Sequence, residues 1–110
     1  MQNFEEVFNQ NPEPYSSIYE FIKSTVLVKY PCLTSCHQSN FDEEGIPKVQ
    51  YYIRYAADLT LEKWHKLRVM IEKDIENFCL DSGVSKDLFM EIDFIVTVDG
   101  DYYLQTGKGF

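Results

Sequence analysis

No apolar run in this chain approaches 18 residues, and its amino terminus lacks the basic-then-apolar pattern of a secretory signal. A membrane-spanning helix needs about 20 mostly apolar residues, so none is expected. With 45% hydrophobic residues, 110 residues are ample for one core, so the three cysteines are not needed as cross-links. We therefore expect a single cytoplasmic domain spanning residues 1–110, without contact with a membrane.

Catalytic motifs are also absent from the sequence. There are only two histidines and no glycine-rich turn around a serine, which excludes the usual nucleophile elbow. The ending Thr106-Gly107-Lys108-Gly109-Phe110 lacks the complete spacing of a phosphate-binding loop. We expect residues 106–110 to form a flexible tail, and we predict a protein that is not an enzyme and needs no cofactor.

Basic residues are scarce. Ten lysines and arginines stand against 18 acidic residues, for a net charge of −8. This charge opposes binding to nucleic acid phosphates and favours basic protein partners. Solubility alone would also explain it.

Two segments have the alternation of half-buried strands. In residues 48–57 the odd positions are Val49, Tyr51, Ile53, Tyr55 and Ala57. Residues 90–98 alternate in the same way, with Met90, Ile92, Phe94, Val96 and Val98 on one face. A period of two predicts that each apolar face packs on the core.

A long amphipathic helix is predicted between these strands. Thr60 is a suitable N-cap and Gly83 a suitable C-terminal residue. An apolar stripe recurs at steps of three and four: Leu61, Trp64, Leu67, Ile71, Ile75 and Phe78. After the second strand, Asp99-Gly100 is a strong hairpin signal, so residues 101–106 are expected to return as a strand.

The first half is predicted to contain the same kinds of element. A helix is expected from about Pro14 to about Val28, with a Ser17/Glu20 capping box and Pro31 after its end. Residues 33–39 then pair with the strand at 48–57 through a turn at residues 40–45. Residues 1–12, which carry Phe4, Val7 and Phe8, are expected to be an arm that docks as a helical turn, frays or lies on a partner.

Together these elements predict an α+β two-layer sandwich in the order α-β-β-α-β-β. Two helices would cover one face of a four-stranded antiparallel sheet. The same order results from moving the first strand of a ferredoxin-like unit to the end of the chain.

The candidate binding residues follow from this sheet. If its odd face is buried, Tyr52, Arg54, Glu91 and Asp93 point outward, and Tyr and Arg are favoured at interfaces. Further candidate acids are Asp42, Glu43 and Glu44 in the first hairpin turn, and Asp99 and Asp101 near the second. We expect a protein-binding domain, specifically an inhibitor or immunity-type factor that covers a basic site on another protein.

Two alternatives remain open at this point. Cys32, Cys36 and His37 lie within six residues and could serve a metal- or thiol-dependent function, although their spacing is poor for a structural zinc site, and no metal is assigned. The second alternative is a self-associating structural subunit, a homodimer formed through a strand edge or the outer sheet face.

Overall fold

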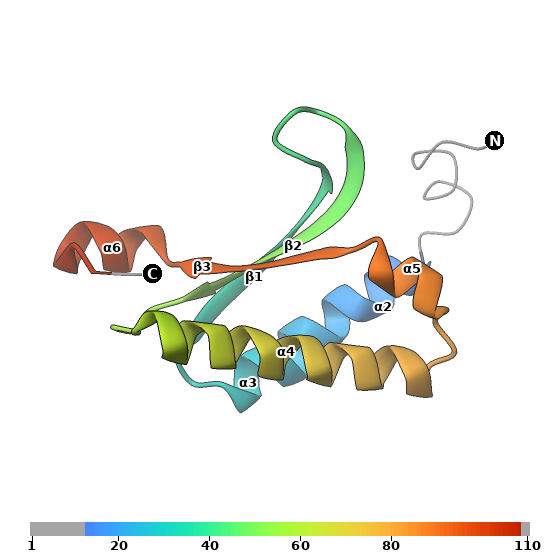
Figure 1. Cartoon of the computed structure of the whole chain (residues 1–110), viewed down its shortest axis with the longest axis horizontal. Helices are drawn as coiled ribbons and strands as arrows, with labels where there is room; N and C mark the ends of the chain where they lie inside the picture. Colours follow the sequence, from blue (N-terminus) through green and yellow to red (C-terminus); the bar gives the residue numbers. More distant parts are fainter. Residues whose placement is uncertain (1–12, 109–110) are drawn as a thin grey trace.

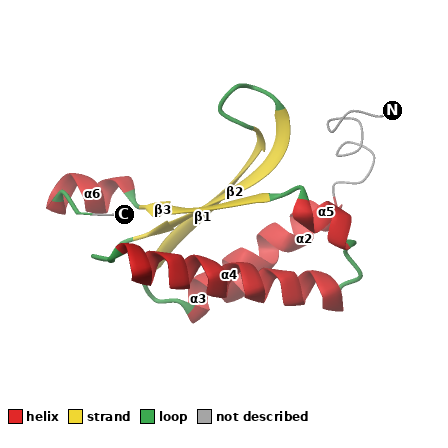
Figure 2. Ribbon diagram, in the orientation of Figure 1, coloured by secondary structure: helices red, strands yellow, loops and turns green. Residues whose placement is uncertain are grey.

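The computed structural model describes residues 13–108, which form a three-stranded mixed sheet with helices packed against one face (Figures 1 and 2). The amino-terminal helical segment consists of α2 (Glu13–Phe21), the π-helix η1 (Ile22–Val26) and α3 (Leu27–Lys29). The remaining elements are β1 (Leu33–Phe41), β2 (Pro47–Tyr55), α4 (Leu61–Asp81), α5 (Lys86–Met90), β3 (Asp93–Val98) and α6 (Gly100–Thr106). Within the described ranges, no helix combines the length and apolarity needed to cross a membrane.

The core lies between β2 and the helices. The predicted odd face of β2 is confirmed, because Val49, Tyr51, Ile53 and Tyr55 are all 0% exposed. The stripe on α4 is confirmed in its middle, where Ile71 and Ile75 are fully buried, but Leu61 is 56% exposed. Thr60 caps α4 by accepting the Lys63 N–H, and Gly83 follows the helix with a positive φ of 77°.

The amino-terminal helix runs close to its predicted length, but its start and its middle differ from the prediction. It begins at Glu13, so Ser17 and Glu20 lie inside the helix and do not form a capping box. The Leu27 N–H donates to the Ile22 carbonyl, five residues back. In an α-helix, a step of four residues rotates a side chain by about 40° more than one full turn. The wider π turn has more residues per turn and so offsets this rotation. From Ile18 onward, the buried residues therefore follow one line at four-residue steps: Ile18, Ile22, Val26 and Tyr30.

The predicted four-stranded antiparallel sheet is wrong. The sheet has the order β1-β2-β3; β1 pairs antiparallel to β2, whereas β3 runs parallel to β2, from Gln50 opposite Asp93 to Tyr55 opposite Val98. The cause is the crossover, because α4 returns the chain to the end where β2 began. Met90, which we assigned to the strand, ends α5 instead and is 69% exposed.

The predicted hairpin at Asp99-Gly100 is also wrong. Neither residue has the positive φ that this turn requires. The Asp99 carboxylate instead accepts the backbone N–H groups of Asp101 at 2.9 Å and Tyr102 at 3.4 Å, and so caps α6. Residues 101–106 are therefore helical, and α6 projects beyond the end of β3 (Figure 1). An aspartate is favoured both in a hairpin turn and at the N-cap of a helix. Only the hairpin needs a returning strand, whereas the cap is formed by local contacts.

Shortening a core side chain of α4 should test the packing. Ile75→Ala is expected to lower the free energy of unfolding by about 2–5 kcal/mol, because it leaves a cavity beneath the sheet. Val69→Ala is the matched control on the same helix, since Val69 is 46% exposed, and should change stability by less than about 0.5 kcal/mol. Urea denaturation measures both, and equal losses would contradict the described burial.

Replacing Gly100 tests whether this residue begins a helix or lies in a hairpin turn. Gly100 has ordinary negative φ, and a Cβ built there meets nothing within 4 Å, so Gly100→Ala should be neutral or stabilise α6 by about 0.4–1 kcal/mol. In a hairpin turn the same change would be clearly destabilising. Hydrogen exchange of the α6 amides measures the effect, and Asp99→Ala should speed that exchange by removing the cap.

Candidate functional site

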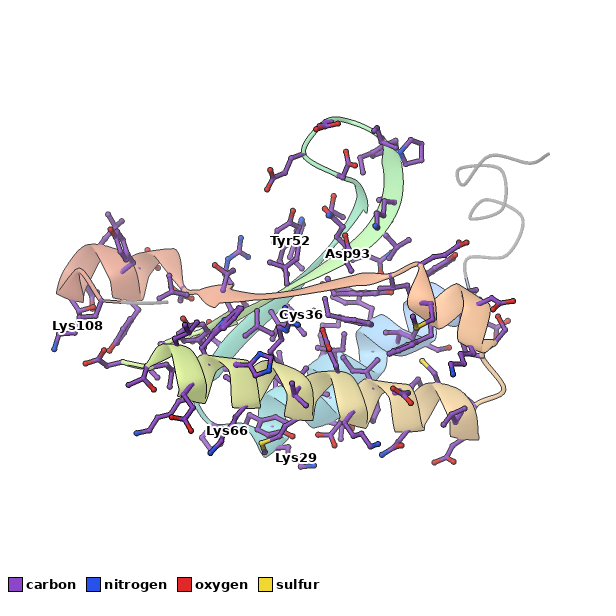
Figure 3. All side chains as sticks on the ribbon, in the orientation of Figure 1. Lys29, Cys36, Tyr52, Lys66, Asp93 and Lys108 are labelled. Atoms are coloured by element: carbon purple, nitrogen blue, oxygen red, sulfur yellow. The ribbon has the colours of Figure 1, made fainter. Side chains whose placement is uncertain are left out.

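The side of the sheet opposite α2, η1 and α4 is the candidate site. We call it the open sheet face. Tyr52 and Asp93 point away from the helices, whereas Cys36 lies between the sheet and the helices (Figure 3). Strand pairing places nine of its residues in three rows across β1, β2 and β3: Ser35, Arg54 and Thr97; His37, Tyr52 and Ile95; Ser39, Gln50 and Asp93.

A polar chain fixes one end of this face. The Tyr52 hydroxyl donates to Gln50 Oε1 at 3.1 Å, and Gln50 Nε2 donates to Asp93 Oδ2 at 3.4 Å. Lys48 Nζ lies 3.3 Å from the same carboxylate oxygen. Gln50 is only 6% exposed, so these bonds satisfy a buried amide. This role of Gln50 was not predicted from the sequence, because only the parallel register places it beside Asp93.

The middle row gives the face its aromatic and apolar centre. Tyr52 is half-buried between exposed His37 on β1 and half-buried Ile95 on β3. Arg54 lies one row away and is also half-buried. Tyr52 and Arg54 therefore share the face that the alternation predicted for them.

The acidic candidates of the first hairpin do not all have the same role. Asp42 Oδ1 accepts the backbone N–H groups of Glu44 and Ile46, each at 2.9 Å, while the Asp42 carbonyl accepts the Gly45 N–H. Asp42 therefore holds the turn, as aspartate commonly does. Glu43 and Glu44 are exposed, so their charged side chains are accessible to solvent.

The remaining acids divide between the two ends of the sheet. Glu91 lies outside the strand, where it lines a hollow of about 360 Å³ with Pro47, Lys48 and Met90. Asp93 pairs with Gln50, so both acids lie toward the end of the sheet where the β1–β2 turn projects (Figure 1). Asp99 lies at the opposite end, where its N–H donates to the Tyr55 carbonyl.

The Asp99 carboxylate is held by local contacts. It accepts the Thr34 hydroxyl at 2.7 Å and caps α6. Hydrogen bonds from Thr34 and from the backbone of Asp101 and Tyr102 hold the pKa of Asp99 below its usual range. We therefore exclude Asp99 from the acidic end of the candidate site.

The structure does not bring the cysteine and histidine cluster together. Cys36 faces the helices, and the Tyr19 hydroxyl donates to its carbonyl at 3.2 Å, whereas His37 is exposed on the open sheet face. Burial raises the pKa of the Cys36 thiol to about 12 and that of Cys79 to about 11, and it also raises the pKa of Cys32. In residues 13–108, no group of three or more His, Cys, Asp or Glu side chains is placed to hold a metal ion.

Comparison with protein-family descriptions, curated proteins and solved structures gave no match for this chain.

The raised pKa values of the Cys36 and Cys79 thiols predict slow alkylation of the native protein. The thiolate is the reactive form, and a raised pKa keeps it scarce at neutral pH. Iodoacetamide at pH 8 should modify Cys36 and Cys79 at least about tenfold more slowly in the native protein than in guanidinium. Peptide mass spectrometry measures each site, and rapid native modification of Cys36 would instead favour a thiol-dependent function.

Proposed function

We propose that this protein is a small, acidic, non-enzymatic protein-binding domain that acts as an inhibitor or immunity-type factor. In this proposal the open sheet face covers a basic site on the partner protein. The observation that carries the proposal is the arrangement of this face. Its half-buried aromatic centre adjoins an end of the sheet where exposed acids gather, and α2, η1 and α4 lie on the opposite side.

The two parts of this surface suit different tasks. Tyr52 and Arg54 belong to the residue types that dominate binding energy when they become buried at an interface. Glu43 and Glu44 are exposed, so the charges of their carboxylates can attract a basic surface over a distance. Asp93 is partly neutralised by Lys48 and held by Gln50, which makes it a positioned acceptor more than a source of long-range field.

At the β1 edge, the sheet supports face binding over strand addition. In the described part of the chain, β1 and β3 are the edge strands. The register of β1 against β2 shifts near both of its ends, between Leu33 and Ser35 and between Ser39 and Phe41. Such irregularities hinder the pairing of another strand with the edge.

Charge-matched variants test the location of the acidic surface. Glu43→Gln/Glu44→Gln and the control Glu20→Gln/Glu62→Gln raise the net charge equally, but Glu20 and Glu62 lie exposed on α2 and α4. In affinity capture from the native host at low salt, a basic protein should be retained by the wild type and the control, and largely lost by the first variant. High salt should weaken the wild-type capture.

The outcome of this comparison decides the proposal. If both double variants lose capture of the basic protein equally, net charge alone would explain the binding. That result would contradict a defined acidic surface. Tyr52→Ala, with an unchanged circular dichroism spectrum, should lower capture at both salt concentrations. Addition of the purified chain should also suppress the activity of the captured partner.

Light scattering tests the homodimer alternative. A stable dimer that Tyr52→Ala dissociates would replace the proposed partner with a second copy of this chain.

A further inference from the structure

An apolar groove lies between the end of α4 and α5, on the helical side of the molecule. It has a volume of about 160 Å³, with Cys79, Leu80, Val84, Phe89 and Met90 among its lining residues. Leu80 is 62% exposed and Met90 69% exposed, although both are large apolar side chains. Glu76 and Lys86 also line the groove and place one charge of each sign there, so the groove selects its occupant by apolar contact and not by charge. Such a groove suits the apolar side of an amphipathic segment.

The chain enters its described part close to this groove. The Tyr51 hydroxyl donates to the Tyr15 carbonyl at 2.8 Å, in the first turns of α2. The Tyr51 ring stacks on Phe94 at 5.6 Å, and Phe94 contacts Phe89, a groove residue, at 5.6 Å. Residues 1–12 would span about 40 Å if extended, so the groove is within their reach.

The sequence of residues 1–12 matches the chemistry of the groove. Phe4, Val7 and Phe8 recur at steps of three and four, the spacing that places apolar side chains on one side of a helical turn. Glu5 and Glu6 lie between Phe4 and Val7, so the segment combines apolar and charged positions. Because the segment is covalently tethered, its effective concentration at the groove is on the order of millimolar, and even a weak contact would be populated.

We propose that residues 1–12 occupy the α4–α5 groove, with Phe4, Val7 and Phe8 covering Leu80 and Met90. This intramolecular docking uses the helical side of the molecule and leaves the open sheet face accessible. It is therefore independent of the proposed partner binding.

Methionine methyl NMR of the full chain tests this docking. Met90 lies in the groove, whereas Met70 is half exposed elsewhere on α4 and serves as an internal reference. Ring currents from the phenylalanines should shift the Met90 methyl proton upfield of the Met70 methyl. In Phe4→Leu/Phe8→Leu the Met90 signal should move toward that of Met70, which should itself stay fixed. An unmoved Met90 signal would overturn the proposal.

Two controls separate docking from a general effect of aromatic loss and from self-association. Tyr103→Leu changes an exposed aromatic residue on α6 and should leave the Met90 signal unchanged. The signal should also be independent of protein concentration if the segment comes from the same chain. A Met90 shift that disappears on dilution would assign the groove to a second copy and overturn intramolecular docking. Met90→Leu and Met70→Leu variants assign the two signals.

Discussion

The burial of one face of β2 is the interaction on which the rest of the structure depends. Val49, Tyr51, Ile53 and Tyr55 are all inaccessible to solvent, and β2 is the strand that pairs with both β1 and β3. Side chains on a strand alternate, so this burial also decides which residues face away from the helices. A shift of one residue would bring Tyr52 and Arg54 into the core and expose the present core to solvent. The core and the candidate binding face are thus two consequences of one register.

Elements with a local signal were predictable from the sequence. The alternation of β2, the Thr60 cap and the buried centre of α4 each depend on residues that are neighbours in the chain. The direction of β3 was not predictable in this way, because parallel pairing depends on where α4 returns the chain. Asp99 shows a second reason why a prediction from sequence can fail. The same side chain favours a turn or a helix cap, and only the contacts of the residues that follow decide between them.

The candidate site was predictable in part for the same reason. Tyr52 and Arg54 share one face because they lie two residues apart on a strand. The separation of Cys36 from His37 follows from the same alternation and was available from the sequence once β1 was assigned. The role of Asp42 had a signal too, since an aspartate three residues before Gly45 is typical of a tight turn. The contact between Gln50 and Asp93 had none, because it requires the parallel register.

Parallel pairing also determines which acids can act together. Had β3 run antiparallel to β2, its first residue would lie beside the end of β2, and Asp99 would approach the β1–β2 turn. In the observed register Asp93 lies beside Gln50, toward the turn that carries Glu43 and Glu44, while Asp99 is tied to Tyr55 and Thr34. The acidic residues consequently differ in role as well as in position. Asp42 and Asp99 maintain the backbone at opposite ends of the sheet, whereas the side chains of Glu43 and Glu44 are exposed to solvent.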